Sequence, residues 1–230
     1  MSTMFSRTMA RAAVMAACLA ASAAANAGFY YSNSAGSPDA TFTTFGINAP
    51  GSGFNNFGSQ LATAGVSNYN LGTSLAVSGP GTVSYSLWGK EAGYTNQFRV
   101  AGSPVFSTAG LPSSSWNQWA STGDYAVSSG LLNFSFCVIA GGSGCVSNAG
   151  NQSTGYASYQ SIGIKIVDAD TAWLLWDDSG AGPDDNHDDM VVRVKYTSVP
   201  EPATSLLFGI GLLGIGLGMR KRSLRGNVAQ

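Results

Sequence analysis

The one dense cluster of polar side chains in the sequence is an acidic segment over residues 176–189. Six aspartates fall within residues 177–189, whereas the whole of residues 28–199 holds eleven acidic residues. Carboxylates this close repel one another unless a positive charge compensates them, and oxygen ligands on a flexible loop suit Ca²⁺. We therefore predict one Ca²⁺ site and no other cofactor. The predicted ligands are Asp177, Asp178, Asp184, Asn186, Asp188 and Asp189.

The spacing within this segment opens like an EF-hand loop but does not complete one. Asp184, Asn186 and Asp188 take the first, third and fifth positions. Asp189 then stands where that loop needs glycine, and Lys195 where it needs a bidentate glutamate. Two alternatives to a Ca²⁺ site stay open. One is a solvated acidic loop that keeps a sheet edge soluble, and the other is a carboxylate pair for glycoside hydrolysis.

His187 is the only histidine and lies inside the acidic segment. Neighbouring aspartates favour its protonated form, and an imidazole has the chemistry of a metal ligand or a general base. We nevertheless expect a solvated neighbour of the acidic loop. Residues 28–199 contain no Gly-x-Ser-x-Gly elbow, phosphate loop or dinucleotide fingerprint. The sequence therefore predicts a protein without enzymatic activity.

Two tryptophans offer a different chemistry, which is stacking against sugar rings. Trp116 and Trp119 lie in a stretch rich in serine and amide side chains, and this composition predicts a loop-like setting. They are our candidate carbohydrate platform. Trp173 and Trp176 lie in an apolar run instead, and we expect them in the core or at a strand edge.

Cys137 and Cys145 are the only cysteines of residues 28–199. The residues between them are rich in glycine, which suits a tight reversal between two strands. An even pair at this spacing in an exported protein forms a disulfide. Two thiolates without nearby histidines make a poor zinc site, so we predict a Cys137–Cys145 disulfide.

The elements that must position these residues are short strands, because helical periodicity is nearly absent from residues 28–199. Apolar residues alternate or cluster in runs that glycine-rich turns separate. The predicted strands cover residues 82–88, 131–139, 162–166, 172–176 and 190–196. This pattern predicts an all-β protein with a single β-sandwich or jelly-roll-like domain over residues 28–198.

The N-terminal segment, residues 1–27, has the pattern of a secretory signal peptide. Arg7 and Arg11 give it a positive start, an alanine-rich apolar run follows, and small residues stand before the expected cut after Ala27.

The C-terminal segment has the pattern of a membrane anchor. Residues 203–219 are uncharged and apolar, at the lower limit of the length that crosses a bilayer as a helix. A basic tail follows over residues 220–225. Positive residues stay cytoplasmic, so residues 28–199 are expected on the other side of the inner membrane.

Charge excludes one class of partner. Residues 28–199 hold five basic and eleven acidic residues, a net charge of −6. A domain with this charge and no basic patch is a poor binder of nucleic acid, because it cannot neutralise phosphates.

Val199-Pro200-Glu201-Pro202, the apolar run and the Arg-Lys-Arg tail together resemble the PEP-CTERM sorting signal of Gram-negative bacteria, over residues 199–225. The resemblance implies that an exosortase, an integral-membrane cysteine enzyme, recognises Pro200, Glu201 and Pro202. The two prolines keep the backbone there extended and free of helix. It also implies a surface or matrix protein, since genomes with this signal usually carry exopolysaccharide loci.

The sequence thus predicts an exported, exosortase-sorted surface or extracellular-matrix protein associated with exopolysaccharide. Residues 203–219 would anchor it transiently in the inner membrane, facing the periplasm, before it reaches the cell surface or is secreted. Two alternatives are a carbohydrate-binding module or adhesin, and a secreted polysaccharide hydrolase. Glycan binding that depends on Trp116 and Trp119 would favour the first, and turnover of a polysaccharide would favour the second.

Overall fold

The fold was obtained as a computed structural model. The residues that it describes are 27–38, 42–47, 55–151, 160–178 and 186–199. Ala27–Val199 forms one compact unit. Its described part is mostly antiparallel β-strand with very little helix, which confirms the all-β prediction.

The two predicted targeting segments, the signal peptide and the apolar run over residues 203–219, lie outside the described residues. Among the residues that are described, no helix has both the length and the apolar character needed to cross a bilayer.

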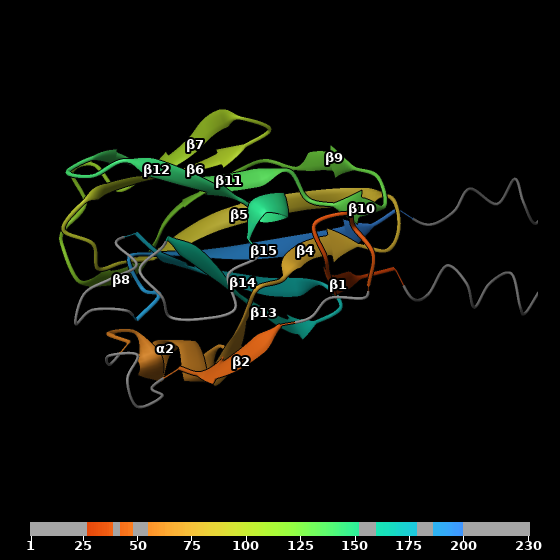
Figure 1. The fold of residues 1–230 in the computed structure, drawn as a ribbon, viewed down its shortest axis with the longest axis horizontal. Coiled ribbons are helices and arrows are strands. Elements are labelled where there is room, and N and C mark those ends of the chain that lie inside the picture. The colour runs from red at the N-terminus through yellow and green to blue at the C-terminus, as the bar shows by residue number, and fades with distance from the viewer. Residues whose placement is uncertain (1–26, 39–41, 48–54, 152–159, 179–185, 200–230) are drawn as a thin grey trace, which may run out of the picture. The chain divides into compact units, whose positions relative to one another are not determined.

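The described strands form three antiparallel sheets (Figure 1). The largest has the order β2-β3-β13-β14-β15-β5-β8, with β9 also paired to β5. Its strands are β2 (Thr43–Gly46), β3 (Asn68–Leu71), β5 (Gly81–Lys90), β8 (Ser115–Ser121), β9 (Tyr125–Val127), β13 (Ser161–Asp168), β14 (Thr171–Asp177) and β15 (Met190–Ser198).

The two smaller sheets contain four and three strands. The four-stranded sheet consists of β12 (Gly144–Ser147), β11 (Phe134–Ala140), β6 (Thr95–Val100) and β7 (Ser103–Ser107), in that order. The three-stranded sheet consists of β1 (Phe29–Ser32), β4 (Ser74–Val77) and β10 (Gly130–Leu131).

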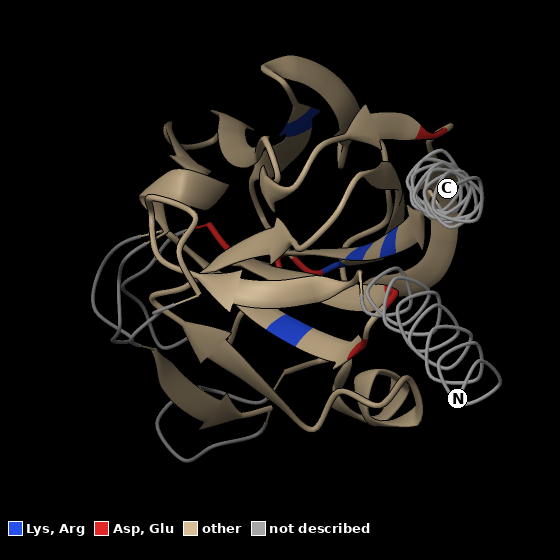
Figure 2. Ribbon diagram, turned by 90° about the vertical axis from the view of Figure 1, so that its right-hand side faces the viewer, with Lys and Arg blue, Asp and Glu red and all other residues tan. Residues whose placement is uncertain are grey.

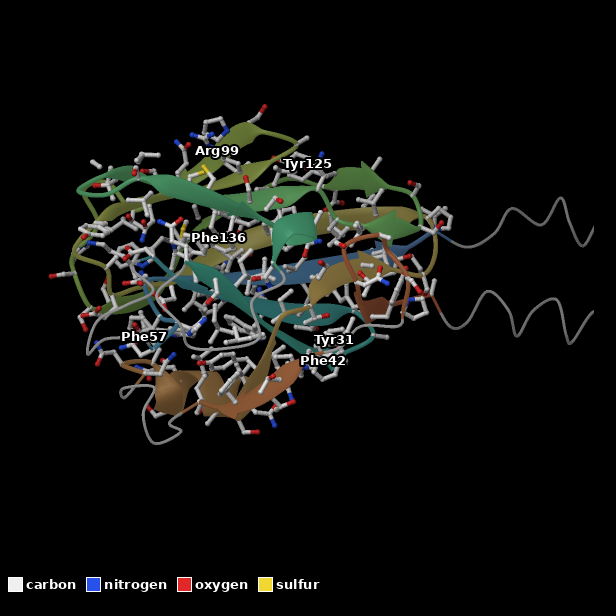
Figure 3. The ribbon with its side chains drawn as sticks, in the orientation of Figure 1. Tyr31, Phe42, Phe57, Arg99, Tyr125 and Phe136 are labelled. Atoms are coloured by element: carbon white, nitrogen blue, oxygen red, sulfur yellow. A yellow bond between two sulfur atoms is a disulfide. The ribbon has the colours of Figure 1, made fainter. Side chains whose placement is uncertain are left out.

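The main core lies between the eight-stranded and four-stranded sheets. Phe136 of β11 stacks on Trp176 of β14, with ring centroids 5.2 Å apart and planes at 9°. Phe98 of β6 contacts Tyr85 of β5 across the same gap. Figure 3 shows Phe136 between the two layers. Burial of these large aromatic rings is the main force that holds the sheets together.

A second core covers the opposite face of the eight-stranded sheet. Phe57 and Leu61, at and within helix α2 (Gly58–Thr63), pack with Tyr69 of β3 against Trp173 and Val191. Strands β14 and β15 are therefore covered on both faces at this end. This double burial explains why their sequences contain continuous apolar runs rather than strict alternation.

Four of the five predicted strands lie within single observed strands, namely β5, β13, β14 and β15. The fifth prediction, one continuous strand over residues 131–139, is wrong. The run is divided between β10 and β11, because the Leu132 N–H bonds to Leu75 and the Asn133 carbonyl accepts from Ala101. The chain thus passes from the three-stranded to the four-stranded sheet between these strands.

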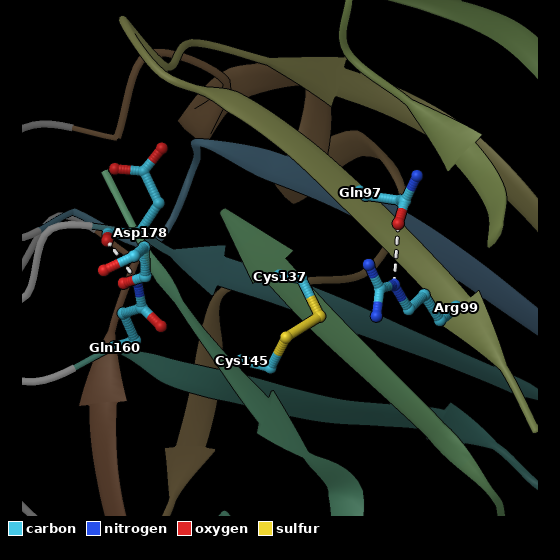
Figure 4. Close-up of a disulfide and its surroundings, with 7 residues drawn as sticks. Gln97, Arg99, Cys137, Cys145, Gln160 and Asp178 are labelled. Carbon is cyan, nitrogen blue, oxygen red and sulfur yellow. Dashed lines mark hydrogen bonds between the residues drawn. A yellow bond between two sulfur atoms is a disulfide. The ribbon is translucent and has the colours of Figure 1, made fainter. Parts of the chain in front are cut away.

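The predicted disulfide is confirmed. Cys137 and Cys145 are direct partners in the β11–β12 register and are bonded to each other. Figure 4 shows the bond joining the two strands. The glycine-rich segment between the cysteines makes the reversal, as expected.

Two buried asparagines hold the backbone around the three-stranded sheet, and Asn151 also bonds to β13 of the large sheet. Asn148, in a 3-10 turn (Asn148–Gly150), donates from Nδ2 to the carbonyls of Leu75 and Leu132 and accepts from the Leu75 N–H through Oδ1, at 2.7–2.8 Å. Asn151 bonds in the same way to both backbone groups of Ile162. Each side chain thus replaces a missing strand neighbour, which satisfies backbone groups that are costly to bury unpaired.

We predict that Asn148→Ala lowers the free energy of unfolding by about 2–4 kcal/mol, because it removes three hydrogen bonds to backbone groups of Leu75 and Leu132. Denaturant unfolding of the full chain, followed by tryptophan fluorescence, measures the change. Asn133→Ala, at an exposed position, is the matched control and is expected to change stability by less than about 0.5 kcal/mol. Equal effects of the two substitutions would contradict the role given to Asn148.

Candidate functional site

Four of the predicted ligand residues gather at one end of the eight-stranded sheet. Asp177 ends β14, Asp178 follows it, and Asp188 and Asp189 precede β15. The pairing of Trp176 with Met190 brings these two segments together. All four aspartates are buried, with exposed fractions of 0–6%. The alternative of a solvated acidic loop is therefore wrong for these residues.

Of the two remaining predicted ligands, Asp184 and Asn186, the structure describes only Asn186. Asp184 lies outside the described residues. Asn186 is buried, and its backbone carbonyl accepts a hydrogen bond from Asn55 Nδ2 at 3.0 Å. The Asn56 N–H donates to Asp188 Oδ2. The segment before α2 is thus hydrogen-bonded to the acidic loop.

Asp178 and Asp189 are linked by a hydrogen bond, and Asp178 has further hydrogen-bond partners. The Asp178 N–H donates to Asp189 Oδ2 at 2.7 Å. Asp178 Oδ2 accepts from Asn96 Nδ2 of β6 at 2.6 Å. The Asp178 carbonyl accepts from Gln160 at 3.0 Å, as Figure 4 shows. Elements from both large sheets therefore fix these carboxylates.

The structure adds a ligand candidate that the sequence prediction missed. Glu91 follows directly after β5, and one of its carboxylate oxygens lies within 4.8 Å of an oxygen of Asp188 and of Asp189. The three oxygens are also mutually within this distance. Glu91 is half-buried while both aspartates are buried. Among the described residues, Asp177 and Asp178 do not belong to this group of three.

These three residues could hold one cation. Ca²⁺–oxygen distances are about 2.3–2.6 Å, so two oxygens on one ion are at most about 5 Å apart. Burial, and next the charge of Asp178, raises the pKa of Asp189 to about 9. The ionised form of Asp189 thus needs a nearby positive charge to exist in this environment.

His187 lies at the centre of the acidic loop and is fully buried. Its Nε2 is 2.7 Å from Ser161 Oγ, and its Nδ1 is 3.3 Å from the Tyr69 hydroxyl. Burial lowers the pKa of His187 to about 4, and attraction to Asp177 opposes this more weakly. The expectation of a solvated, more basic histidine is therefore wrong, because desolvation outweighs the aspartates.

The contacts of His187 depend on two backbone features. His187 itself adopts a left-handed conformation with φ 53°, which its neighbours must hold in place. Gly163 of β13 allows the Tyr69 ring to pack against the strand, since a Cβ there would come within 2.5 Å of that ring. The imidazole is thereby fixed between β3 and β13.

The Ser161–His187 contact has the geometry of a nucleophile and its base. Ser161 has an exposed fraction of 2% and His187 of 0%. A substrate must reach the serine oxygen for such a pair to act. In this arrangement the contact instead ties the acidic loop to the first residue of β13.

The two tryptophans of the predicted carbohydrate platform do not share a surface. Both lie on strand β8 rather than in a loop. Trp116 packs against Phe57 and Trp173 of the second core, whereas Trp119 packs against the main core. They are three positions apart in the strand, which places them on opposite faces. The sequence prediction missed this edge strand because its serine-rich composition is typical of a loop.

Pro200, Glu201 and Pro202 lie outside the described residues. The last described residue is Val199, which is 53% exposed and follows directly after β15. Its N–H donates to the Pro80 carbonyl at 3.1 Å.

Comparison with known protein families identifies the C-terminal segment. Residues 198–222 match the PEP-CTERM protein-sorting motif, so the chain carries this signal, and the match implies an exported protein that an exosortase sorts. The match covers the C-terminal signal and assigns no family to the β-domain. Searches of curated proteins and of solved structures found no match to the chain.

We predict that Ser161→Ala lowers the free energy of unfolding by about 1–3 kcal/mol, because it removes the 2.7 Å hydrogen bond between Ser161 Oγ and the buried imidazole. Thermal or denaturant unfolding measures this loss, with Ser129→Ala at an exposed position as the control. If Ser161 were a nucleophile instead, the substitution would abolish turnover of a substrate while leaving stability close to that of the control.

Proposed function

We propose that the protein is a non-enzymatic surface or extracellular-matrix protein whose β-domain is stabilised by Ca²⁺ at the acidic loop. The PEP-CTERM match at residues 198–222 carries the sorting half of this proposal. The convergence of Glu91, Asp188 and Asp189 carries the Ca²⁺ half.

The location follows from the sorting signal. The motif implies export through the inner membrane with a C-terminal anchor. Residues 203–219 would supply that anchor and the basic tail would stay cytoplasmic. Exosortase processing at Pro200, Glu201 and Pro202 then releases the β-domain to the cell surface or the exopolysaccharide matrix. The disulfide suits the oxidising compartments on this route.

The ion would serve structure rather than chemistry. Glu91 comes from the end of β5, and Asp188 and Asp189 come from the loop before β15. A cation among them would join these segments and compensate their charges. Extracellular Ca²⁺ modules typically bind with dissociation constants of about 10⁻⁴–10⁻³ M. Removal of the ion would therefore weaken the domain without abolishing an activity.

The hydrolase alternative has less support than the structural one. A glycosidase needs two carboxyl groups that face a substrate, about 5 Å or more apart. Asp188 and Asp189 are 0% and 6% exposed, which leaves Glu91 as the accessible member of the group. The carbohydrate-binding alternative draws support from a different surface, the face of the eight-stranded sheet that carries Lys165, Arg193 and Lys195.

We predict that saturating Ca²⁺ raises the thermal midpoint of the full chain by about 5–10 °C relative to EDTA. Binding at 100 times the dissociation constant stabilises by about 2.7 kcal/mol, and each kcal/mol shifts the midpoint of a domain this size by about 2–4 °C. Calorimetry or tryptophan fluorescence in mild detergent measures the shift.

Two variants make the Ca²⁺ test specific. Glu91→Gln removes one ligand charge and is expected to weaken binding at least about tenfold, because a charged carboxylate is replaced by a weaker neutral ligand. Asp124→Asn, at an exposed position between β8 and β9, removes the same charge and is expected to leave the Ca²⁺ shift intact. An identical midpoint with Ca²⁺ and with EDTA would refute the site.

The proposed recognition of the C-terminal segment by an exosortase can be tested separately. Replacement of Pro200, Glu201 and Pro202 by alanine should leave the full-length chain in the inner membrane of a host with an exosortase, because the recognition segment is lost. Cell fractionation and mass spectrometry of the C-terminus measure this outcome. Thr204→Ala/Ser205→Ala is the control. Normal release of the triple variant would contradict the assignment.

A further inference from the structure

The face of the eight-stranded sheet beyond the second core carries a regular polar surface. Directly paired residues on neighbouring strands share a face. One row of such pairs crosses five strands, and its members are Lys165, Trp173, Arg193, Ser86 and Ser121. The next row contains Thr171, Lys195 and Ser84, and a third contains Thr197 and Thr82. Within these rows Trp173, Ser86 and Thr171 are buried, and the other members are half-buried or exposed. We call these three rows the hydroxyl–basic face.

Three of the five basic residues of the domain lie on this face, although the domain has a net charge of −6. Figure 2 shows lysine and arginine on central strands, with most acidic residues toward strand ends and turns. The nearest acid in the register is Asp168, opposite Thr171 and exposed. The distribution therefore creates a local positive surface on an acidic protein.

The basic side chains contact neutral groups. Lys165 Nζ donates to Asn68 Oδ1 and Lys195 Nζ donates to Thr171 Oγ1, each at 2.5 Å. Arg193 Cζ lies 4.9 Å from the Trp88 ring centroid and 6.0 Å from that of Trp173. Its Nε has no hydrogen-bond partner among the described residues. The positive charges are thus oriented by these contacts without being neutralised by them.

A cluster of indole rings holds the guanidinium plane. The ring of Trp116 stacks on Trp173 at 5.8 Å and lies 5.9 Å from that of Trp88. Trp88 and Trp116 are half-buried, so each keeps part of its ring at the surface. A guanidinium is planar, and stacking on aromatic rings fixes the orientation of its plane, although the Nε of Arg193 is buried.

We propose that the hydroxyl–basic face, with Trp88 and Trp116 at its edge, binds an acidic polysaccharide, a chain of sugar rings that carry carboxylates. The half-buried and exposed hydroxyls, among them those of Ser84, Thr82 and Thr197, match sugar hydroxyls. Half-buried indoles match sugar faces, and the basic residues match repeated carboxylates. Lys165 and Arg193 are two strands apart, about 10 Å, and Arg193 and Lys195 are about 7 Å apart along β15. Such spacing suits charges repeated along an extended polymer.

Charge and composition decide against other occupants. Duplex DNA carries one negative charge per about 1.7 Å of its axis. The net charge of −6 therefore repels it more strongly than a polymer whose carboxylates are spaced about 7–10 Å apart, to match the basic residues. A folded protein partner would need a central apolar patch, whereas this face presents hydroxyl and basic groups. The proposal rests on the extracytoplasmic location argued above, but not on the Ca²⁺ site.

The test is affinity electrophoresis of the full chain in EDTA, with sodium alginate as the acidic probe and with dextran and DNA as comparisons. We expect retardation by alginate that weakens with added salt, and none by dextran. Lys165→Gln/Lys195→Gln should lower the affinity about tenfold, since each exposed charge contributes modestly. Arg193→Lys should also lower it, although the charge is kept, because the planar fork is lost.

Arg99→Gln is the matched control, since it removes a charge from β6 in the four-stranded sheet and should leave alginate binding unchanged. The thermal midpoint of each variant reports folding, and the surface lysine pair keeps the test valid if Arg193→Lys unfolds. No retardation by alginate, equal retardation by dextran or DNA, or an equal loss in Arg99→Gln would overturn the proposal. Because the test contains neither Ca²⁺ nor exosortase, its failure leaves the proposed function unaffected.

Discussion

The cost of burying ionisable oxygens governs the end of the large sheet where β14 and β15 meet. Asp177, Asp178, Asp188 and Asp189 are all buried there. Buried carboxylates need hydrogen-bond donors and a compensating charge. Backbone N–H groups of Asn56 and Asp178 and the amide of Asn96 supply the donors. A bound cation would supply the charge, and His187 cannot, because its burial keeps it neutral at physiological pH.

The sheets around this site explain how so polar a cluster can be held at all. The large sheet is covered by aromatic rings on both faces at this end, with Trp176 in one core and Trp173 in the other. A strand packed on both sides has little freedom to shift. The polar residues that follow β14 and precede β15 are therefore presented in a fixed arrangement. The buried amides of Asn148 and Asn151 secure the adjoining small sheet by the same rule of full hydrogen bonding.

Local patterns in the sequence predicted the parts of the fold that depend on local chemistry. Alternation at residues 82–88 and 162–166 identified β5 and β13, and the glycine-rich spacing of Cys137 and Cys145 identified the β11–β12 hairpin. Glu91 escaped prediction because its neighbours in the site are distant in sequence and meet it only through the β5–β15 pairing. The setting of His187 was misjudged for a related reason. The sequence shows the aspartates beside His187, but it does not show that Tyr69 and Ser161, which are distant in sequence, contact the buried imidazole.

The position of β15 links the fold to the sorting signal. This strand lies between β14 and β5, and it ends at Ser198, the first residue of the matched motif. It is a central strand, yet it is the last described one along the chain. A polypeptide that crosses a membrane from its N-terminus delivers this strand after all the others. The large sheet can therefore close only after β15 has emerged. A pull on the residues after Ser198 would act on a strand that is hydrogen-bonded to a neighbour on each side.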